Sequence, residues 1–131
     1  AEAAGPDDAL RRLALAYWRF AWDAPDLYQV MYGLGGVPFG VAATWEEGWR
    51  IGHAAMPVVA AIHPAGDPAG AAEVEARVLA FWGTLHGLVA LSMAGRIAGG
   101  QDGATGLVER AARDAVAAWA GRRPAIDGGT P

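Results

Sequence analysis

The sequence contains no cysteine and no lysine, and only 18% of its 131 residues are charged. Without cysteine the chain can form no disulfide bond, no thiolate metal site and no cysteine nucleophile. All ten basic residues are arginines, never more than two in a row, and the formal net charge is −4. Binding to DNA depends on clustered cationic side chains that contact phosphates. We therefore expect this chain by itself to bind no DNA.

Patterns that would indicate catalysis or metal binding are also missing. The three histidines, His53, His63 and His86, have none of the spacings with which helices present metal ligands. No serine or threonine stands beside an evident base. Glu46 and Glu47 fall at a predicted helix start, where carboxylates suit the helix dipole. We therefore expect no enzyme activity, no catalytic residue, no bound metal and no cofactor.

The chain does contain one long uncharged stretch, residues 78–95, between Arg77 and Arg96. Its bulky apolar residues recur at helical spacing and form one broad stripe. Small residues form a second stripe, in which each glycine costs a helix about 1 kcal/mol relative to alanine. We interpret this second stripe as a flat strip on which another helix packs closely. Its members are Gly83, Gly87, Ala90 and Ala94.

A membrane span is an alternative for residues 78–95, because this stretch approaches the length needed to cross a bilayer. Against it, His86, Thr84 and Ser92 are polar, three glycines interrupt the run, and one arginine at each end gives no charge bias. No charged-then-apolar leader is present, so export is not indicated. We favour a helix of a globular, cytoplasmic protein that does not contact a membrane.

Apolar periodicity and the positions of glycine and proline predict an all-α chain with no strand. We expect Asp7 or Asp8 to cap the first helix and Asp67 to cap the fourth. Pro57 should kink or split the third helix, and a capping box at residues 44–47 would move its start to Trp45. The five predicted helices span residues 8–22, 25–32, 41–62, 68–98 and 104–120.

The remaining segments are predicted to be turns and irregular connections within one domain, residues 1–131. We expect order from about residue 7 to residue 121 and a flexible tail at 122–131. The glycine-rich residues 33–40 should form a flexible connection, which in a regulator could border a pocket. Gly121 should end the fifth helix. The turn before that helix is predicted to contain Gly99, Gly100 and Gly103.

Six tryptophans are a heavy aromatic load, and such rings must line a core, a pocket or an interface. Trp45, Trp49 and His53 stand four residues apart and share a helix face, as do Trp82 and His86. If these two faces oppose each other, they enclose an aromatic cavity with a few polar groups. Ordinary core packing is the alternative for any single ring. The candidate ligand-binding residues are Trp22, Tyr32, Phe39, Trp45, Trp49, His53, Trp82 and His86.

The role of His86 has two interpretations. As a buried histidine, it would bond through its ring nitrogens to the backbone or to a neighbouring side chain. As a pocket residue, its neutral imidazole would offer a polar contact to an otherwise apolar ligand, and Thr84 is a further candidate for such a contact. The sequence alone leaves both interpretations open.

Two motifs resemble a known family. Trp82-Gly-Thr-Leu-His86-Gly87, followed by Ala94-Gly95-Arg96, is similar to the Trp–His–Gly signature of one class of TetR-type regulator C-terminal domains. Residues 20–32 resemble the opening motif of that class, in which a helix ends before a proline and a short helix with Leu-Tyr follows. The resemblance covers roughly residues 9–121. It does not include a helix-turn-helix, since no segment of this chain reads as one.

The resemblance implies an all-α, five-helix bundle whose last two helices form a four-helix dimer interface across a two-fold axis. It also implies an effector-sensing domain that binds a small apolar or aromatic ligand and controls DNA binding by an N-terminal head absent from this chain. Small-residue strips on the fourth and fifth helices suit such an interface, because a two-fold contact requires a self-complementary patch. The expected interface residues of the homodimer are Gly83, Gly87, Ala90, Ala94, Ala111, Ala115, Ala118 and Trp119.

Two other functions are open alternatives. The chain could be a structural helical dimerisation module that binds no ligand because its own rings fill the cavity. It could also be a small helical membrane protein or a small helical enzyme.

Overall fold

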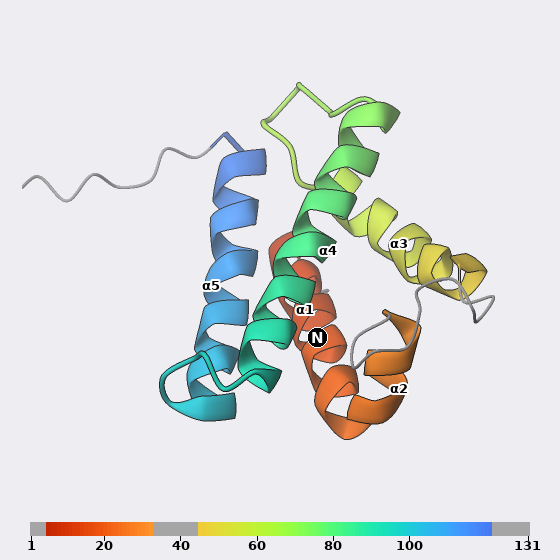
Figure 1. Ribbon diagram of the computed structural model, residues 1–131. Coiled ribbons are helices and arrows are strands. Elements are labelled where there is room, and N and C mark those ends of the chain that lie inside the picture. Colours follow the sequence, from red (N-terminus) through yellow and green to blue (C-terminus); the bar gives the residue numbers. More distant parts are fainter. Residues whose placement is uncertain (1–4, 33–44, 122–131) are drawn as a thin grey trace, which may run out of the picture.

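The computed structural model describes residues 5–32 and 45–121, with side chains described from residue 49 onward in the second range. These ranges contain five α-helices and no strand, so the predicted all-α fold is confirmed (Figure 1). The glycine-rich connection, Phe39, the side chain of Trp45 and the tail at 122–131 lie outside the described residues. The helices are α1 (Pro6–Asp23), α2 (Pro25–Met31), α3 (Trp45–Ala60), α4 (Ala71–Met93) and α5 (Gly100–Trp119).

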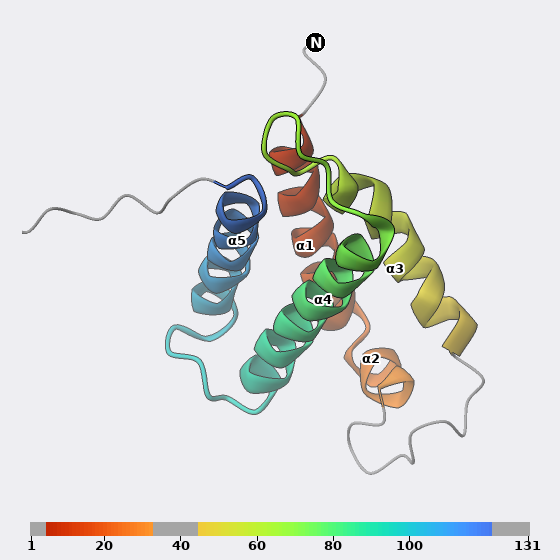
Figure 2. The ribbon, with the colours of Figure 1, turned by 90° about the horizontal axis from the view of Figure 1, so that it is seen from above.

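Helix α1 is the centre of the bundle and contacts each of the other four helices. Helices α4 and α5 lie side by side across α1, α3 lies on the other side of α4, and α2 lies beyond the C-terminal end of α1 (Figures 1 and 2). The sequence of α1 explains its position, because partly buried apolar residues flank a fully buried stripe. That stripe is Leu10, Ala14, Tyr17, Trp18 and Ala21.

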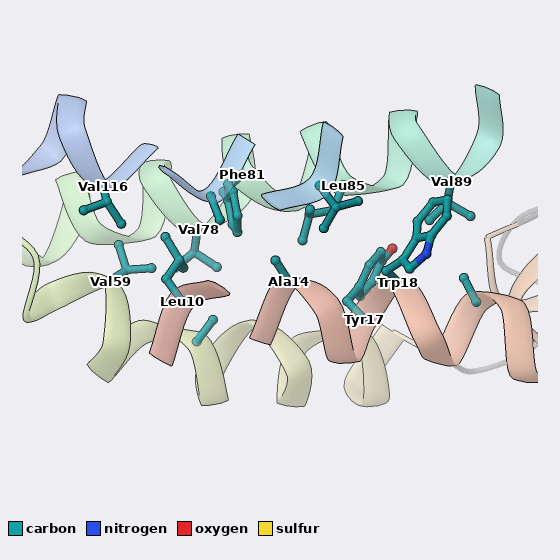
Figure 3. Close-up of a cluster of buried hydrophobic side chains, with 14 of the residues drawn as sticks. Leu10, Ala14, Tyr17, Trp18, Val59, Val78, Phe81, Leu85, Val89 and Val116 are labelled. Atoms are coloured by element: carbon teal, nitrogen blue, oxygen red, sulfur yellow. The ribbon is translucent and has the colours of Figure 1, made fainter. Parts of the chain in front are cut away.

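The core lies between α1 and α4 and is completed by α3 and α5 (Figure 3). Burying one large apolar side chain contributes roughly 1.5–3 kcal/mol, so a stripe of five holds α4 firmly against the bundle. Helix α4 is also long and apolar enough, by length and composition alone, to cross a membrane. In this structure its apolar stripe is buried against protein. The stripe is Val74, Val78, Phe81, Leu85 and Val89.

Arg77, near the start of α4, contacts residues at the ends of α3, α4 and α5. One guanidinium nitrogen donates to the Ile62 carbonyl oxygen just after α3 at 3.2 Å, and Nε donates to Glu73 at 2.8 Å. The guanidinium carbon also lies 5.8 Å from the ring centroid of Trp119 at the end of α5. This cation–π geometry fixes Trp119 within its own chain.

The predicted cap of the first helix is wrong. Helix α1 begins at Pro6, and neither Asp7 nor Asp8 caps it with a side chain. Proline suits the first helical position because its φ is already helical and its missing N–H needs no partner there. Asp8 lies inside the first turn and pairs with Arg11 and Arg12 at 3.1 and 2.7 Å.

The fourth helix is shorter than predicted. It begins at Ala71 and ends at Met93, and Gly70 occupies the cap position that was expected for Asp67. Gly95 has a left-handed φ of +66°, a conformation that ends a helix and that glycine adopts without strain. The third helix begins at residue 45, as the capping-box alternative predicted, and is not split at its internal proline.

The fifth helix begins earlier than predicted, at Gly100, so that Gly103 lies in its first turn rather than in the preceding connection. Gly103 is needed there because the helix passes close to the end of that connection. A Cβ atom at position 103 would collide with the carbonyl oxygen of Ala98. Gly106, one turn later, has nothing within 4 Å of a Cβ atom at its position.

Replacing Gly103 with alanine should lower the free energy of unfolding by about 1–3 kcal/mol, because the backbone of the connection must shift to relieve the collision. Gly106→Ala is the matched control and should stabilise the chain by up to about 1 kcal/mol, since alanine favours a helix over glycine. Urea unfolding of both variants measures these changes. Equal effects of the two substitutions would contradict the close approach at Gly103.

Candidate functional site

Five polar aromatic side chains meet where α1, α2 and α4 come together. Tyr17 comes from α1, Tyr28 from α2, Tyr32 from the residue that follows α2, and Trp82 and His86 from α4. We call these five the polar cluster. Figure 3 shows Tyr17 on the side of α1 that faces α4. The cluster lies within a core whose described buried residues are otherwise apolar.

Hydrogen bonds connect all five members of the polar cluster. The indole Nε1–H of Trp82 donates to the hydroxyl oxygens of Tyr17 at 3.1 Å and of Tyr32 at 3.2 Å. The hydroxyl groups of Tyr17 and Tyr28 are 3.0 Å apart. The Tyr28 hydroxyl also lies 2.6 Å from His86 Nδ1. A neighbouring side chain therefore bonds a His86 ring nitrogen, as the first of the two interpretations of His86 expected.

Local helical geometry places these side chains in pairs. Trp82 and His86 are four residues apart on α4, and Tyr28 and Tyr32 are four apart at the end of α2, so each pair shares one face. The rings pack as well as bond, with the Tyr32 centroid 4.7 Å from that of His86 and 6.1 Å from that of Trp82. The predicted common direction of Trp82 and His86 is confirmed, because both reach the tyrosines.

Burial shifts the pKa of every titratable group in the cluster. Burial raises the pKa of Tyr28, which is 0% exposed, to about 12. Burial also raises the pKa of Tyr17 and of Tyr32 well above the ordinary value of tyrosine. The pKa of His86 is lowered, because burial disfavours the charged imidazolium. The whole cluster is therefore uncharged near neutral pH.

Other candidate ligand-binding residues lie elsewhere in the bundle. Trp49 and His53 stack on one another on α3, with ring centroids 5.6 Å apart, so their predicted common face is confirmed. His53 is exposed, whereas Trp49 is partly buried. Thr84, a further candidate, is exposed and bonds the Ala80 carbonyl of its own helix at 3.0 Å, which leaves it outside the cluster.

Trp22 lies on the side of α1 that faces α5, apart from the polar cluster. Its ring packs edge-on against Trp18 with centroids 5.8 Å apart. Both rings line an open groove of about 490 Å³ that includes Gln101 and Thr105 of α5. Among the described residues, Trp22 Nε1 is the one buried side-chain nitrogen or oxygen without a hydrogen-bond partner.

Sequence reasoning missed Tyr17 and Tyr28 as site residues. Tyr17 entered only as part of the predicted helix 8–22, and Tyr28 only as part of the motif at residues 20–32. The available signal was chemical, because a buried tyrosine hydroxyl needs a hydrogen-bond partner and so indicates a polar contact inside the core.

A comparison with known protein families identifies the family of this chain. The family model described as the tetracyclin repressor-like C-terminal domain matches residues 10–115. The chain belongs to this family. The match covers most of α1, all of α2, α3 and α4, and most of α5, so the TetR resemblance is confirmed and the domain is one of regulators. Comparisons with curated proteins and with solved structures gave no match.

The small-residue strip on α4 of this TetR-like domain faces outward. Gly83 and Ala94 are exposed, and Gly87 and Ala90 are partly buried. A Cβ atom at either glycine would have nothing within 4 Å. Close packing inside the chain therefore does not explain these two glycines, which cost helix stability where they stand.

The corresponding strip on α5 is partly used within the chain. Ala111 and Ala115 are partly buried and pack against the core, whereas Ala118 is exposed. Trp119 packs edge-on against Phe81 with ring centroids 5.9 Å apart. Of the residues expected at a dimer interface on this helix, Trp119 is therefore already held by α4.

The folded domain should show no tyrosinate absorbance near pH 10, where a free tyrosine is half ionised. All three tyrosines of the sequence are in the polar cluster, so no other tyrosine obscures the measurement. The unfolded chain releases its phenolic protons at a lower pH than the folded chain, so the free energy of unfolding should fall as pH rises above about 10.

Ultraviolet difference absorbance during an alkaline titration checks this prediction, with the same titration in denaturant as the control. A tyrosine that ionises with the ordinary pKa in the folded protein would show that the cluster is open to water.

Proposed function

We propose that this chain is the effector-sensing and dimerisation domain of a cytoplasmic TetR-family transcriptional regulator. The family match supports the regulatory role, and the polar cluster is the observation that carries the sensing role. Ligand sites are mostly apolar, with a few placed polar groups that give specificity. The cluster supplies such groups inside an apolar bundle, and a small apolar or aromatic effector would suit it.

The connection between α2 and α4 suggests how an effector would act. Helix α2 bonds α4 through a polar side chain, since the Tyr28 hydroxyl lies 2.6 Å from His86 Nδ1. Helix α2 has seven residues, and so short a helix depends on tertiary contacts for its stability. An effector that contacts His86 or Tyr32 would favour one position of α2 relative to α4. It would shift the population of the domain accordingly.

The output of this shift would pass through α4, which carries both the polar cluster and the outward small-residue strip. In the proposed homodimer, the strips of two copies pack across a two-fold axis. A change at the cluster would then alter the relation between the subunits and between two DNA-reading domains. Whether the regulator is a repressor or an activator depends on those domains and their operator.

The same geometry also favours a second candidate, a structural dimerisation module that senses nothing. The indole N–H and the Tyr17 and Tyr28 hydroxyls already have partners inside the chain. A cluster whose polar groups bond one another can contribute to the stability of the fold without binding a ligand. A binding experiment separates this candidate from the sensing domain.

The first test of the proposal concerns the dimer. Gly87→Leu should convert the dimer to monomer, because a large side chain would hold the partner's α4 away. The matched control is Gly106→Leu, on α5 and outside the expected strip, which should remain dimeric. Both positions have open space in the single chain, so both variants should fold. Sedimentation equilibrium measures the result, and an unchanged Gly87→Leu dimer would place the interface elsewhere.

The second test concerns the effector. A panel of small apolar and aromatic compounds should include members that raise the thermal unfolding midpoint. Ligand at a hundred times its Kd stabilises a protein by about 2.7 kcal/mol. Trp82→Phe should reduce the shift, because it removes a cluster N–H. Trp22→Phe should keep the shift, because the Trp22 N–H bonds nothing described and faces α5. A panel that leaves the midpoint unchanged throughout would favour the structural module.

A further inference from the structure

The hydrogen bonds of the polar cluster form a chain whose direction is set at one end. The indole N–H of Trp82 can only donate, so the Tyr17 oxygen accepts from it at 3.1 Å. The Tyr17 hydroxyl is 3.0 Å from that of Tyr28, which in turn lies 2.6 Å from His86 Nδ1. Two hydroxyl groups, those of Tyr17 and Tyr28, therefore connect the indole N–H of Trp82 to an imidazole nitrogen.

The length of the last hydrogen bond favours one of its two possible directions. Bonds from O–H donors are short, whereas bonds from N–H donors to oxygen centre on about 2.9–3.0 Å. A separation of 2.6 Å between Tyr28 and His86 therefore indicates that the phenol O–H donates and that Nδ1 accepts. In this direction Tyr17 accepts from Trp82 and donates to Tyr28, and Tyr28 donates to His86. The opposite direction would require an imidazole N–H to donate across this short distance.

The favoured direction corresponds to one tautomer of His86. A neutral imidazole whose Nδ1 accepts a hydrogen bond carries its proton on Nε2. His86 Nε2 makes none of the described hydrogen bonds, and it is not among the described buried atoms that lack a partner. It is therefore accessible, and it presents an N–H donor beside the ring faces of Tyr28 and Tyr32.

We propose that His86 Nε2–H is the donor with which this domain recognises its effector, and that the effector is an uncharged carbonyl compound with an aromatic or apolar body. The effector must carry a hydrogen-bond acceptor, because His86 Nε2–H is a donor. An uncharged acceptor is favoured because no arginine bonds the cluster among the described residues, and an unpaired buried carboxylate is costly. This inference rests on the proposed sensing function.

The tautomer is tested first, on the wild-type chain without ligand. Long-range proton–nitrogen NMR spectra distinguish a protonated from an unprotonated ring nitrogen, and His86→Gln assigns the resonances. We expect Nε2 protonated and Nδ1 unprotonated in His86. The opposite tautomer would overturn the inference whatever the binding data show.

Recognition is tested with two probes of nearly the same shape, acetophenone and α-methylstyrene, in which a CH₂ group replaces the carbonyl oxygen. For each protein, the Kd of α-methylstyrene is divided by the Kd of acetophenone. This ratio should be roughly three- to tenfold larger in wild type than in His86→Leu, the range expected for one neutral hydrogen bond. His86→Gln, whose amide N–H₂ can still donate, should retain the preference. Acetophenone should also move the His86 Nε2 resonance of the wild-type chain.

The outcomes separate this inference from the proposed function. If both probes bind and their Kd ratio is the same in wild type and His86→Leu, sensing stands and recognition by His86 is overturned. If neither the probes nor any compound of the panel binds, the sensing function fails and this inference fails with it. The wild-type NMR measurements decide the matter even if His86→Leu does not fold.

Discussion

The arrangement of α1, α2 and α4 depends on the hydroxyl group of Tyr17. This group accepts the indole N–H of Trp82 on α4 and bonds the hydroxyl of Tyr28 on α2, so it joins both helices to α1. Tyr17 is only 8% exposed. A hydroxyl group buried there without a hydrogen-bond partner would destabilise the fold by its free energy of desolvation. The relative position of the three helices is therefore constrained by directional bonds as well as by apolar packing.

Helix α2 is held in the bundle differently from helices α4 and α5. Helices α4 and α5 bury continuous apolar stripes, and such packing tolerates little movement. Helix α2 has seven residues and one buried residue, Tyr28, whose hydroxyl bonds His86 of α4. So short a helix depends on tertiary contacts for its stability. It lies next to the polar cluster, the effector site that we propose.

Helix α4 has two sides with different compositions, one bulky and apolar and one with small residues. Its bulky stripe is buried in the core, while Gly83 and Gly87 face outward with open space around them. A helix built only for the core of a monomer would gain stability from alanine at both positions. Their presence is therefore a physical reason to expect a second helix close by, and α4 would then join the proposed effector site to the proposed subunit contact.

The sequence by itself determined the helices and the side-chain pairs within them, because periodicity, Pro25 and the spacing of Trp82 and His86 act locally. It placed some helix starts wrongly, as at Gly100, because a glycine can begin a helix as readily as it can form a turn. Only the tertiary structure decided which rings meet. The partners of Tyr28 lie 11 and 58 residues away, and Trp22 turns to α5 although it shares α1 with Tyr17. No local sequence pattern predicts contacts between residues so far apart in the sequence, since these contacts result from how the apolar stripes of separate helices pack.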